Sequence, residues 1–264
     1  MIWMLLIAAA QPAAAGAVLP ADGGVVSLVA DEGEAQCLPD RSLCLEVQGE
    51  RTDEGGRNLL ISSPASDDAE KVSLPLAHGT DGSDVSLWPK LIPVQRTSED
   101  GTRLPPEYLV GVIEEQRAMY SGGGGSGGRL HLLRLGMAPH ATGLREVFEV
   151  VWDSSLMIRA CFSDQDMEDR LGACHDEYDF KGTLAAAPND GGELPALTFR
   201  SFATAYPLTS RRTEDNSGQK LKKSDLARWS DPECSYTRTL RYNPATLRYE
   251  MDRAAPDCSV YTTP

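Results

Sequence analysis

The chain has 264 residues and carries 39 acidic side chains against 25 lysines and arginines, which gives a net charge of −14. A surplus of negative charge this large repels phosphate backbones and anionic membrane surfaces, so it argues against nucleic acid as a partner. The length allows either one large all-β domain or two smaller domains, each with a core of its own.

The first predicted element is a secretory signal peptide at residues 1–17. Residues 2–10 form an apolar run that is too short to span a bilayer, for which about 20 apolar residues are needed. Small residues follow and offer A-x-A cleavage sites that end at Ala15 or Ala17. No Lys or Arg precedes the run, so a buried N-terminal strand or helix is the alternative. We expect cleavage after Ala17, a periplasmic or secreted mature protein, and no stable membrane insertion after cleavage.

The rest of the chain consists of short apolar or alternating segments separated by Gly, Pro, Asp and Asn, a pattern typical of strands. Strands are predicted at residues 25–30, 43–48, 58–62, 71–76, 91–96, 108–120, 129–137, 145–152, 156–162, 177–185, 196–206, 234–242 and 246–251. Helix is predicted only at 164–171 and 222–229. The pattern therefore predicts a single, all-β, mainly antiparallel domain over residues 18–264. A sandwich or distorted barrel with long loops is expected, with an irregular propeller-like fold as the alternative, although no fixed repeat is present.

The glycine-rich segment 121–128 separates two of the predicted strands. We expect it to be the mobile tip of a long hairpin, and a linker between two domains is the alternative. Residues 124–128 also match the G-x-S-x-G pattern of serine hydrolases. That motif requires a strand-to-helix turn, whereas an apolar strand is predicted to follow here, so the match is not evidence for a hydrolase.

A second hairpin is predicted near the C-terminus, where Asn243 and Pro244 favour a tight turn. We expect Tyr242 to pair with Leu247. That register places one set of side chains on an inward face: Tyr236, Leu240, Tyr242, Leu247 and Tyr249. The polar face then carries Thr237, Thr239, Arg241, Arg248 and Glu250.

The six cysteines fall into three groups that are close in sequence. An even number of cysteines in an exported chain indicates disulfides, and six cysteines allow 15 pairings. We predict the sequential pairing Cys37–Cys44, Cys161–Cys174 and Cys234–Cys258. Zinc binding by these cysteines is the alternative, but no pair has the two-residue spacing of a zinc knuckle.

The second predicted disulfide encloses a loop rich in carboxylates. Asp164, Asp166, Glu168 and Asp169 are the candidate ligands of a calcium ion, because calcium prefers carboxylate oxygens on a constrained loop. The EF-hand pattern fails, since Asp169 stands where that motif has glycine, and a solvated acidic loop is the alternative. No other cofactor is indicated.

The histidines give only weak indications of catalysis. His175 lies beside two carboxylates and is the candidate for acid–base chemistry in a hydrolase. His78 and His131 occur in unrelated contexts, a turn and an apolar strand, and no metal triad or Ser-His-Asp set can be assembled from spacing alone.

These features predict an exported envelope protein and favour a binding or interaction module over an enzyme. Its partner would be another protein or an envelope component. An extracytoplasmic hydrolase that uses His175 and nearby carboxylates is one alternative, and a structural envelope component is the other.

Overall fold

The computed structural model describes residues 24–31, 33–49, 56–64, 71–79, 83–95, 98, 100–102, 104, 107–136, 143–159, 161–188, 192–216 and 218–264. The predicted signal peptide, residues 1–17, lies outside these ranges. Within them, no helix has the length and apolar character needed to cross a membrane.

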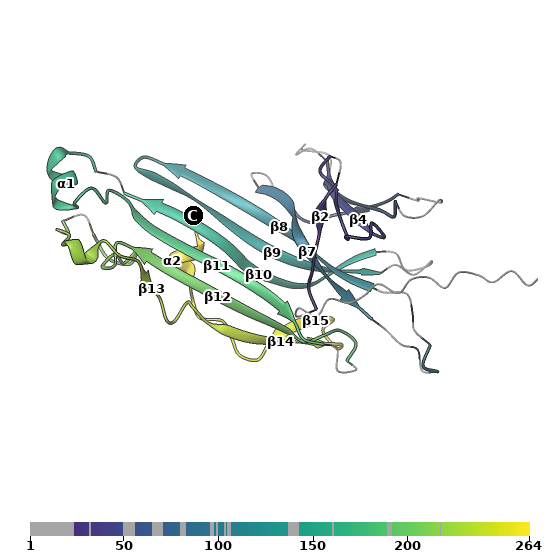
Figure 1. Ribbon diagram of the computed structural model, residues 1–264. Coiled ribbons are helices and arrows are strands. Elements are labelled where there is room, and N and C mark those ends of the chain that lie inside the picture. Colours follow the sequence, from purple (N-terminus) through teal and green to yellow (C-terminus); the bar gives the residue numbers. More distant parts are fainter. Residues whose placement is uncertain are drawn as a thin grey trace, which may run out of the picture.

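The protein is built from two antiparallel sheets (Figure 1). The strands of the larger sheet are β1 (Val26–Ser27), β7 (Ser83–Val94), β8 (Glu107–Tyr120), β9 (Gly123–Gly136), β10 (Gly143–Ile158), β11 (Asp176–Ala186), β12 (Leu197–Tyr206), β13 (Trp229–Ser230), β14 (Thr237–Asn243) and β15 (Arg248–Met251). Their order is β1-β7-β8-β9-β10-β11-β12-β14-β15, and β13 pairs with β12. The smaller sheet follows chain order through β2 (Val29–Ala30), β3 (Gln36–Cys37), β4 (Cys44–Gln48), β5 (Asn58–Ser62) and β6 (Val72–Pro75). The all-β prediction is confirmed, and the arrangement is sandwich-like.

The middle of the larger sheet is buried on both faces. Along β8, Leu109 packs into one apolar cluster, whereas Val110 and Val112 pack into another that also contains side chains of the smaller sheet. Successive residues of a strand point to opposite faces, so the uninterrupted apolar run in β8 supplies both clusters.

The predicted break between strands 145–152 and 156–162 does not occur. Strand β10 runs through Ser154, which pairs with Phe180 of β11 and Gly127 of β9. The Ser154 hydroxyl is buried and donates a hydrogen bond to the backbone carbonyl of Tyr261. A polar side chain is accommodated inside the strand because the C-terminal segment provides its acceptor.

The loop prediction for the glycine-rich segment is wrong for residues 123–128. The turn is confined to Ser121 and Gly122, and Gly123–Gly128 belong to β9, where they pair with both β8 and β10. A Cβ atom at Gly127 would lie 3.3 Å from the Pro264 side chain, so the C-terminal segment packs directly against the glycine backbone. The absence of side chains creates room for that segment.

The C-terminal hairpin forms, but its register differs from the predicted one by two residues. Tyr242 pairs with Tyr249, and the turn contains Leu247, which has a positive φ of 57° and is exposed. A shift of two residues keeps the side chains within the two strands on their predicted faces, because the strand period is also two, but it moves Leu247 into the turn. Leu247 is therefore the one member of the predicted inward set that the structure places outside.

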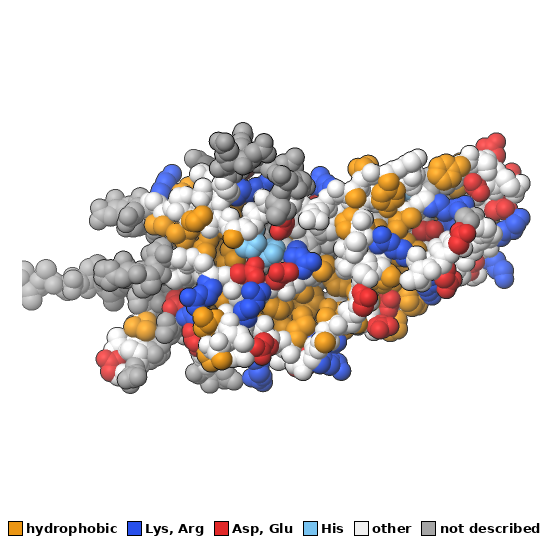
Figure 2. All heavy atoms as spheres, turned by 180° about the vertical axis from the view of Figure 1, so that it is seen from behind, with side chains coloured by type: hydrophobic (Ala, Val, Ile, Leu, Met, Phe, Trp, Pro, Cys, Tyr) orange, Lys and Arg blue, Asp and Glu red, His pale blue; other side chains and the backbone are white. Residues whose placement is uncertain are grey.

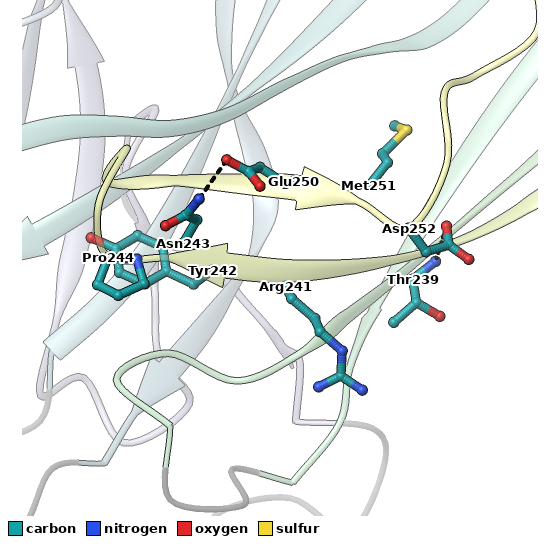
Figure 3. Close-up of a pocket in the computed structure, with 8 residues that line it drawn as sticks. All are labelled: Thr239, Arg241, Tyr242, Asn243, Pro244, Glu250, Met251 and Asp252. Carbon is teal, nitrogen blue, oxygen red and sulfur yellow. Dashed lines mark hydrogen bonds between the residues drawn. The ribbon is translucent and has the colours of Figure 1, made fainter.

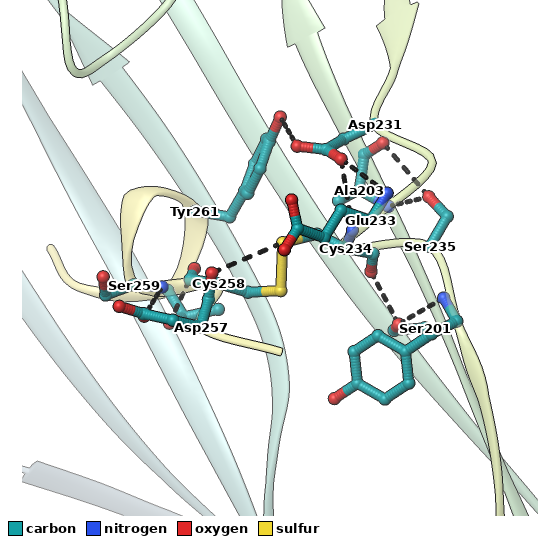
Figure 4. Close-up of a disulfide and its surroundings, with 12 residues drawn as sticks. Ser201, Ala203, Asp231, Glu233, Cys234, Ser235, Asp257, Cys258, Ser259 and Tyr261 are labelled. Atoms are coloured by element: carbon teal, nitrogen blue, oxygen red, sulfur yellow. Dashed lines mark hydrogen bonds between the residues drawn. A yellow bond between two sulfur atoms is a disulfide. The ribbon is translucent and has the colours of Figure 1, made fainter. Parts of the chain in front are cut away.

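All three predicted disulfides are present: Cys37–Cys44, Cys161–Cys174 and Cys234–Cys258. The third fastens the C-terminal segment, with helix α2 (Ser259–Thr262), to the loop between β13 and β14 of the larger sheet (Figure 4). Beside it, the Tyr261 hydroxyl donates to Asp231 over 2.9 Å. Three disulfides are typical of proteins that mature in an oxidising compartment.

Candidate functional site

The four predicted calcium ligands lie on or next to the short helix α1 (Asp164–Asp169), which Ser163 caps. The Asp169 carboxylate lies 3.1 Å from the Lys220 ammonium group, and Asp166 accepts a hydrogen bond from the backbone of Phe162. In the part of the chain that the structure describes, no three of the four carboxylates converge on a common point. Calcium binding stays a prediction.

His175 and its two acidic neighbours point to different partners. Nδ1 of His175 bonds to the backbone carbonyl of Arg159 at 2.6 Å, which makes this nitrogen the donor. Asp176 is buried against Arg170, while Glu177 forms an exposed ion pair with Arg228. The three side chains are thus separately engaged, and a hydrolase that uses His175 also stays a prediction.

A shallow hollow of about 370 Å³ lies on the C-terminal hairpin (Figure 3). Four of its lining residues form hydrogen bonds with one another. Asp252 accepts a hydrogen bond from the backbone of Thr239, and Asn243 donates to Glu250 over 2.8 Å. No histidine lines it, so we do not regard it as the functional site.

The second hollow, of about 450 Å³, contains a cluster of side chains from distant parts of the chain. His78 follows β6 of the smaller sheet, whereas His131 lies on β9 and Glu146 on β10 of the larger one. We call these three residues the His–Glu cluster. Figure 2 shows histidine side chains beside acidic and basic ones in the middle of this face of the molecule.

A β-bulge brings the carboxylates of β10 to the site. Glu146 pairs with Leu133 and Glu149 pairs with His131, because the register shifts at Val147. Residues three apart on a regular strand point to opposite faces, but the extra residue of the bulge turns both glutamates to the face of His131.

The three members of the cluster share a single oxygen atom. Oε2 of Glu146 lies 2.8 Å from Nε2 of His78 and 2.9 Å from Nδ1 of His131. The centres of the two imidazole rings are 4.1 Å apart. The histidine side chains are only 10% and 7% exposed, so this arrangement is held within the protein.

Two further groups hold the cluster from outside. Arg248 of the C-terminal hairpin donates to Oε1 of Glu146 over 2.8 Å. Glu114 of β8 accepts a hydrogen bond from the Ser83 hydroxyl, and its Oε2 lies 3.5 Å from Nε2 of His131. The two carboxylates nearest the rings are therefore each held by a further side chain, Glu146 by Arg248 and Glu114 by Ser83.

Glu146 is ionised over the whole physiological range. Burial acts to raise the pKa of this carboxyl, but hydrogen bonds from His78, His131 and Arg248 outweigh it and lower the pKa to about 2. The cluster thus offers one carboxylate oxygen and two imidazole nitrogens, all within 4.8 Å of one another. This donor set is one that zinc and related divalent ions prefer.

No protein-family model, curated protein or solved structure matches the chain.

The sequence carried no local signal for this site. His78 and Glu146 are 68 residues apart, and only the packing of the smaller sheet on the larger one joins them. The one available hint was His131, a polar residue within the apolar strand that continues as Leu132 and Leu133. Without its partners, that residue had the pattern of an ordinary core histidine.

Proposed function

We propose that the protein is an exported binding module of the cell envelope and that its His–Glu cluster binds one divalent transition-metal ion of the zinc class. The observation that carries the proposal is the convergence of His78 Nε2, His131 Nδ1 and Glu146 Oε2 at the edge of a hollow. Two imidazoles and one carboxylate form a frequent three-residue zinc set.

The distances suit an ion with little rearrangement. A tetrahedral zinc ion, with bonds of about 2.0–2.1 Å, separates its ligand atoms by about 3.3 Å. The two nitrogen–oxygen separations are 2.8 and 2.9 Å. Each must therefore open by about half an ångström, which side-chain rotation supplies.

The surroundings of His131 favour the metal-bound tautomer. When Nδ1 of a neutral imidazole donates its proton to Glu146, the lone pair of Nε2 faces the Glu114 carboxylate, and Nε2 has no hydrogen-bond partner in the described structure. With a metal on Nδ1, the proton moves to Nε2 and points at Glu114. A carboxylate behind a ligating histidine is the usual outer contact at zinc sites.

Export is supported by the predicted leader and by the three disulfides. Its test is expression of the full chain in a bacterium with an oxidising periplasm, followed by fractionation and mass spectrometry. We expect the periplasmic product to begin at Val18. An uncleaved product confined to the cytoplasm would reject this part of the proposal.

Metal binding is tested by isothermal titration of the chelator-treated protein with zinc chloride. We expect one equivalent to bind, and His131→Asn to weaken binding at least 100-fold because one of three ligands is lost. His175→Asn is the matched control. It makes the same substitution at a histidine outside the cluster and keeps a donor for the carbonyl of Arg159.

The two variants separate a specific site from adventitious binding. Equal zinc affinity of His131→Asn and wild type would refute the site. Thermal unfolding of the metal-free proteins checks that both variants fold, and zinc should raise the melting temperature of wild type and His175→Asn only.

A further inference from the structure

The proposed metal site, on which this inference rests, has three protein ligands in the described part of the chain. Glu114 faces the outer nitrogen of His131, so it orients the ring and does not reach the ion. Glu149 is not counted as a ligand either, because its carboxylate accepts a hydrogen bond of 2.6 Å from Arg129. A tetrahedral ion held by three ligands keeps a fourth position open, as zinc ions that bind exogenous molecules do.

The hollow beside this fourth position has an apolar wall. Leu76, Leu133 and Leu144 line it together with Pro75 and Ala77. Its volume of about 450 Å³ lies within the range of small-molecule sites, about 300–1,000 Å³. An apolar wall beside a metal ion favours a ligand that has one coordinating end and one hydrocarbon end.

The charges around the ion favour an anion at the coordinating end. Three carboxylates face the hollow, those of Glu114, Glu146 and Glu149. Among the described residues, Arg129 forms an ion pair with Glu149 and Arg248 with Glu146. A bound dication adds positive charge at the fourth position, and this charge favours an anion as the ligand there.

We propose that the metal-loaded site binds a small aliphatic carboxylate, whose oxygen takes the fourth position on the ion and whose hydrocarbon tail lies along Leu76, Leu133 and Leu144. No covalent step is involved. The ligand exchanges for the water that occupies an open position on such an ion.

The inference is tested with the cobalt(II)-loaded protein, because the visible spectrum of cobalt responds to a change of ligand. Acetate, butyrate and hexanoate are titrated separately. We expect each to change the spectrum, with affinity rising about fourfold per methylene group because each buried methylene contributes to binding. A spectrum unchanged at saturating hexanoate would mean that the coordination shell is already complete, and would overturn the inference.

Two leucine variants test the apolar wall. Leu144→Asn places a polar group on the wall at a half-buried position, and we expect it to abolish the dependence on chain length while cobalt still binds. Leu247→Asn makes the same change at the exposed hairpin turn and should behave as wild type. Equal affinity of the wild type for acetate and hexanoate would also overturn the inference.

These outcomes are distinct from failure of the metal site itself. If the proposed function is wrong, cobalt does not bind stoichiometrically and no spectrum develops. If only the present inference is wrong, cobalt binds with one equivalent and the carboxylates leave its spectrum unchanged or act without regard to their length.

Discussion

The ion pair between Arg170 and Asp176 offers the sharpest test of how the fold is held together. Their side chains are 1% and 4% exposed, and Nη2 of Arg170 lies 2.5 Å from Oδ1 of Asp176. The guanidinium also donates to the carbonyl of Ala173 over 2.8 Å. The pair therefore joins the loop closed by the second disulfide to the first residue of β11.

Removing one partner should be costly because it leaves the other charge buried without compensation. Asp176→Asn keeps the shape of the side chain and deletes its charge, and we expect it to lower the free energy of unfolding by about 3–5 kcal/mol. The double variant Arg170→Met/Asp176→Leu should lose less than the two single substitutions added together, since no charge remains inside.

The measurement is urea unfolding of the oxidised protein, followed by circular dichroism. Arg228→Met is the control, because Arg228 is 48% exposed and pairs with Glu177 and Asp179 at the surface. Such a pair contributes about 0–1 kcal/mol. If Asp176→Asn changes stability no more than Arg228→Met does, the reasoning about buried charge is refuted.

Three further predictions use the same unfolding assay. Gly111→Ala should lower the free energy of unfolding by about 1–3 kcal/mol, because its Cβ would lie 2.7 Å from the Trp88 side chain. Gly143→Ala is the control and should be neutral, because its Cβ would have no neighbouring atom within 4 Å. Equal losses of stability in the two variants would contradict the packing at Gly111. Leu240→Ala removes a side chain with no exposed surface and should cost about 2–5 kcal/mol, and a loss below 1 kcal/mol would place that residue outside the core. In the metal-free protein, the lowered pKa of Glu146 predicts that this carboxylate stabilises the fold by about 3 kcal/mol above pH 4.5, and that the stabilisation declines as the pH falls towards 2. It is measured as the difference in the free energy of unfolding between wild type and Glu146→Gln. A difference that does not change with pH would contradict the prediction.

Local features of the sequence determined most of the strands and all three disulfides. Cysteines that lie close in sequence need little chain rearrangement to meet, so Cys37–Cys44 could be paired without knowledge of the fold. Alternation of apolar and polar residues likewise assigned the faces of the C-terminal hairpin. These assignments, except that of Leu247, remained correct after a register change of two residues.

The glycine-rich segment is the place where prediction from local composition failed. Its composition favours a flexible loop, since glycine loses the most conformational freedom on ordering. Pairing with β8 on one side and β10 on the other supplies backbone hydrogen bonds that outweigh this cost. The C-terminal segment then packs against Gly127, where a Cβ atom would lie only 3.3 Å from the Pro264 side chain.

The sequence by itself determined that the protein is acidic, contains three disulfides and consists mainly of antiparallel strands. These properties follow from composition, from the alternation of apolar and polar residues and from the close spacing of the cysteines, all of which can be read without knowing the fold. Only the tertiary structure decided where the candidate site lies. His131 and Glu146 lie on the larger sheet and His78 follows the last strand of the smaller one, and a bulge at Val147 sets the direction of the carboxylate. Such convergence depends on which strands are neighbours and on which face each side chain leaves its strand, and neither is encoded in any short segment.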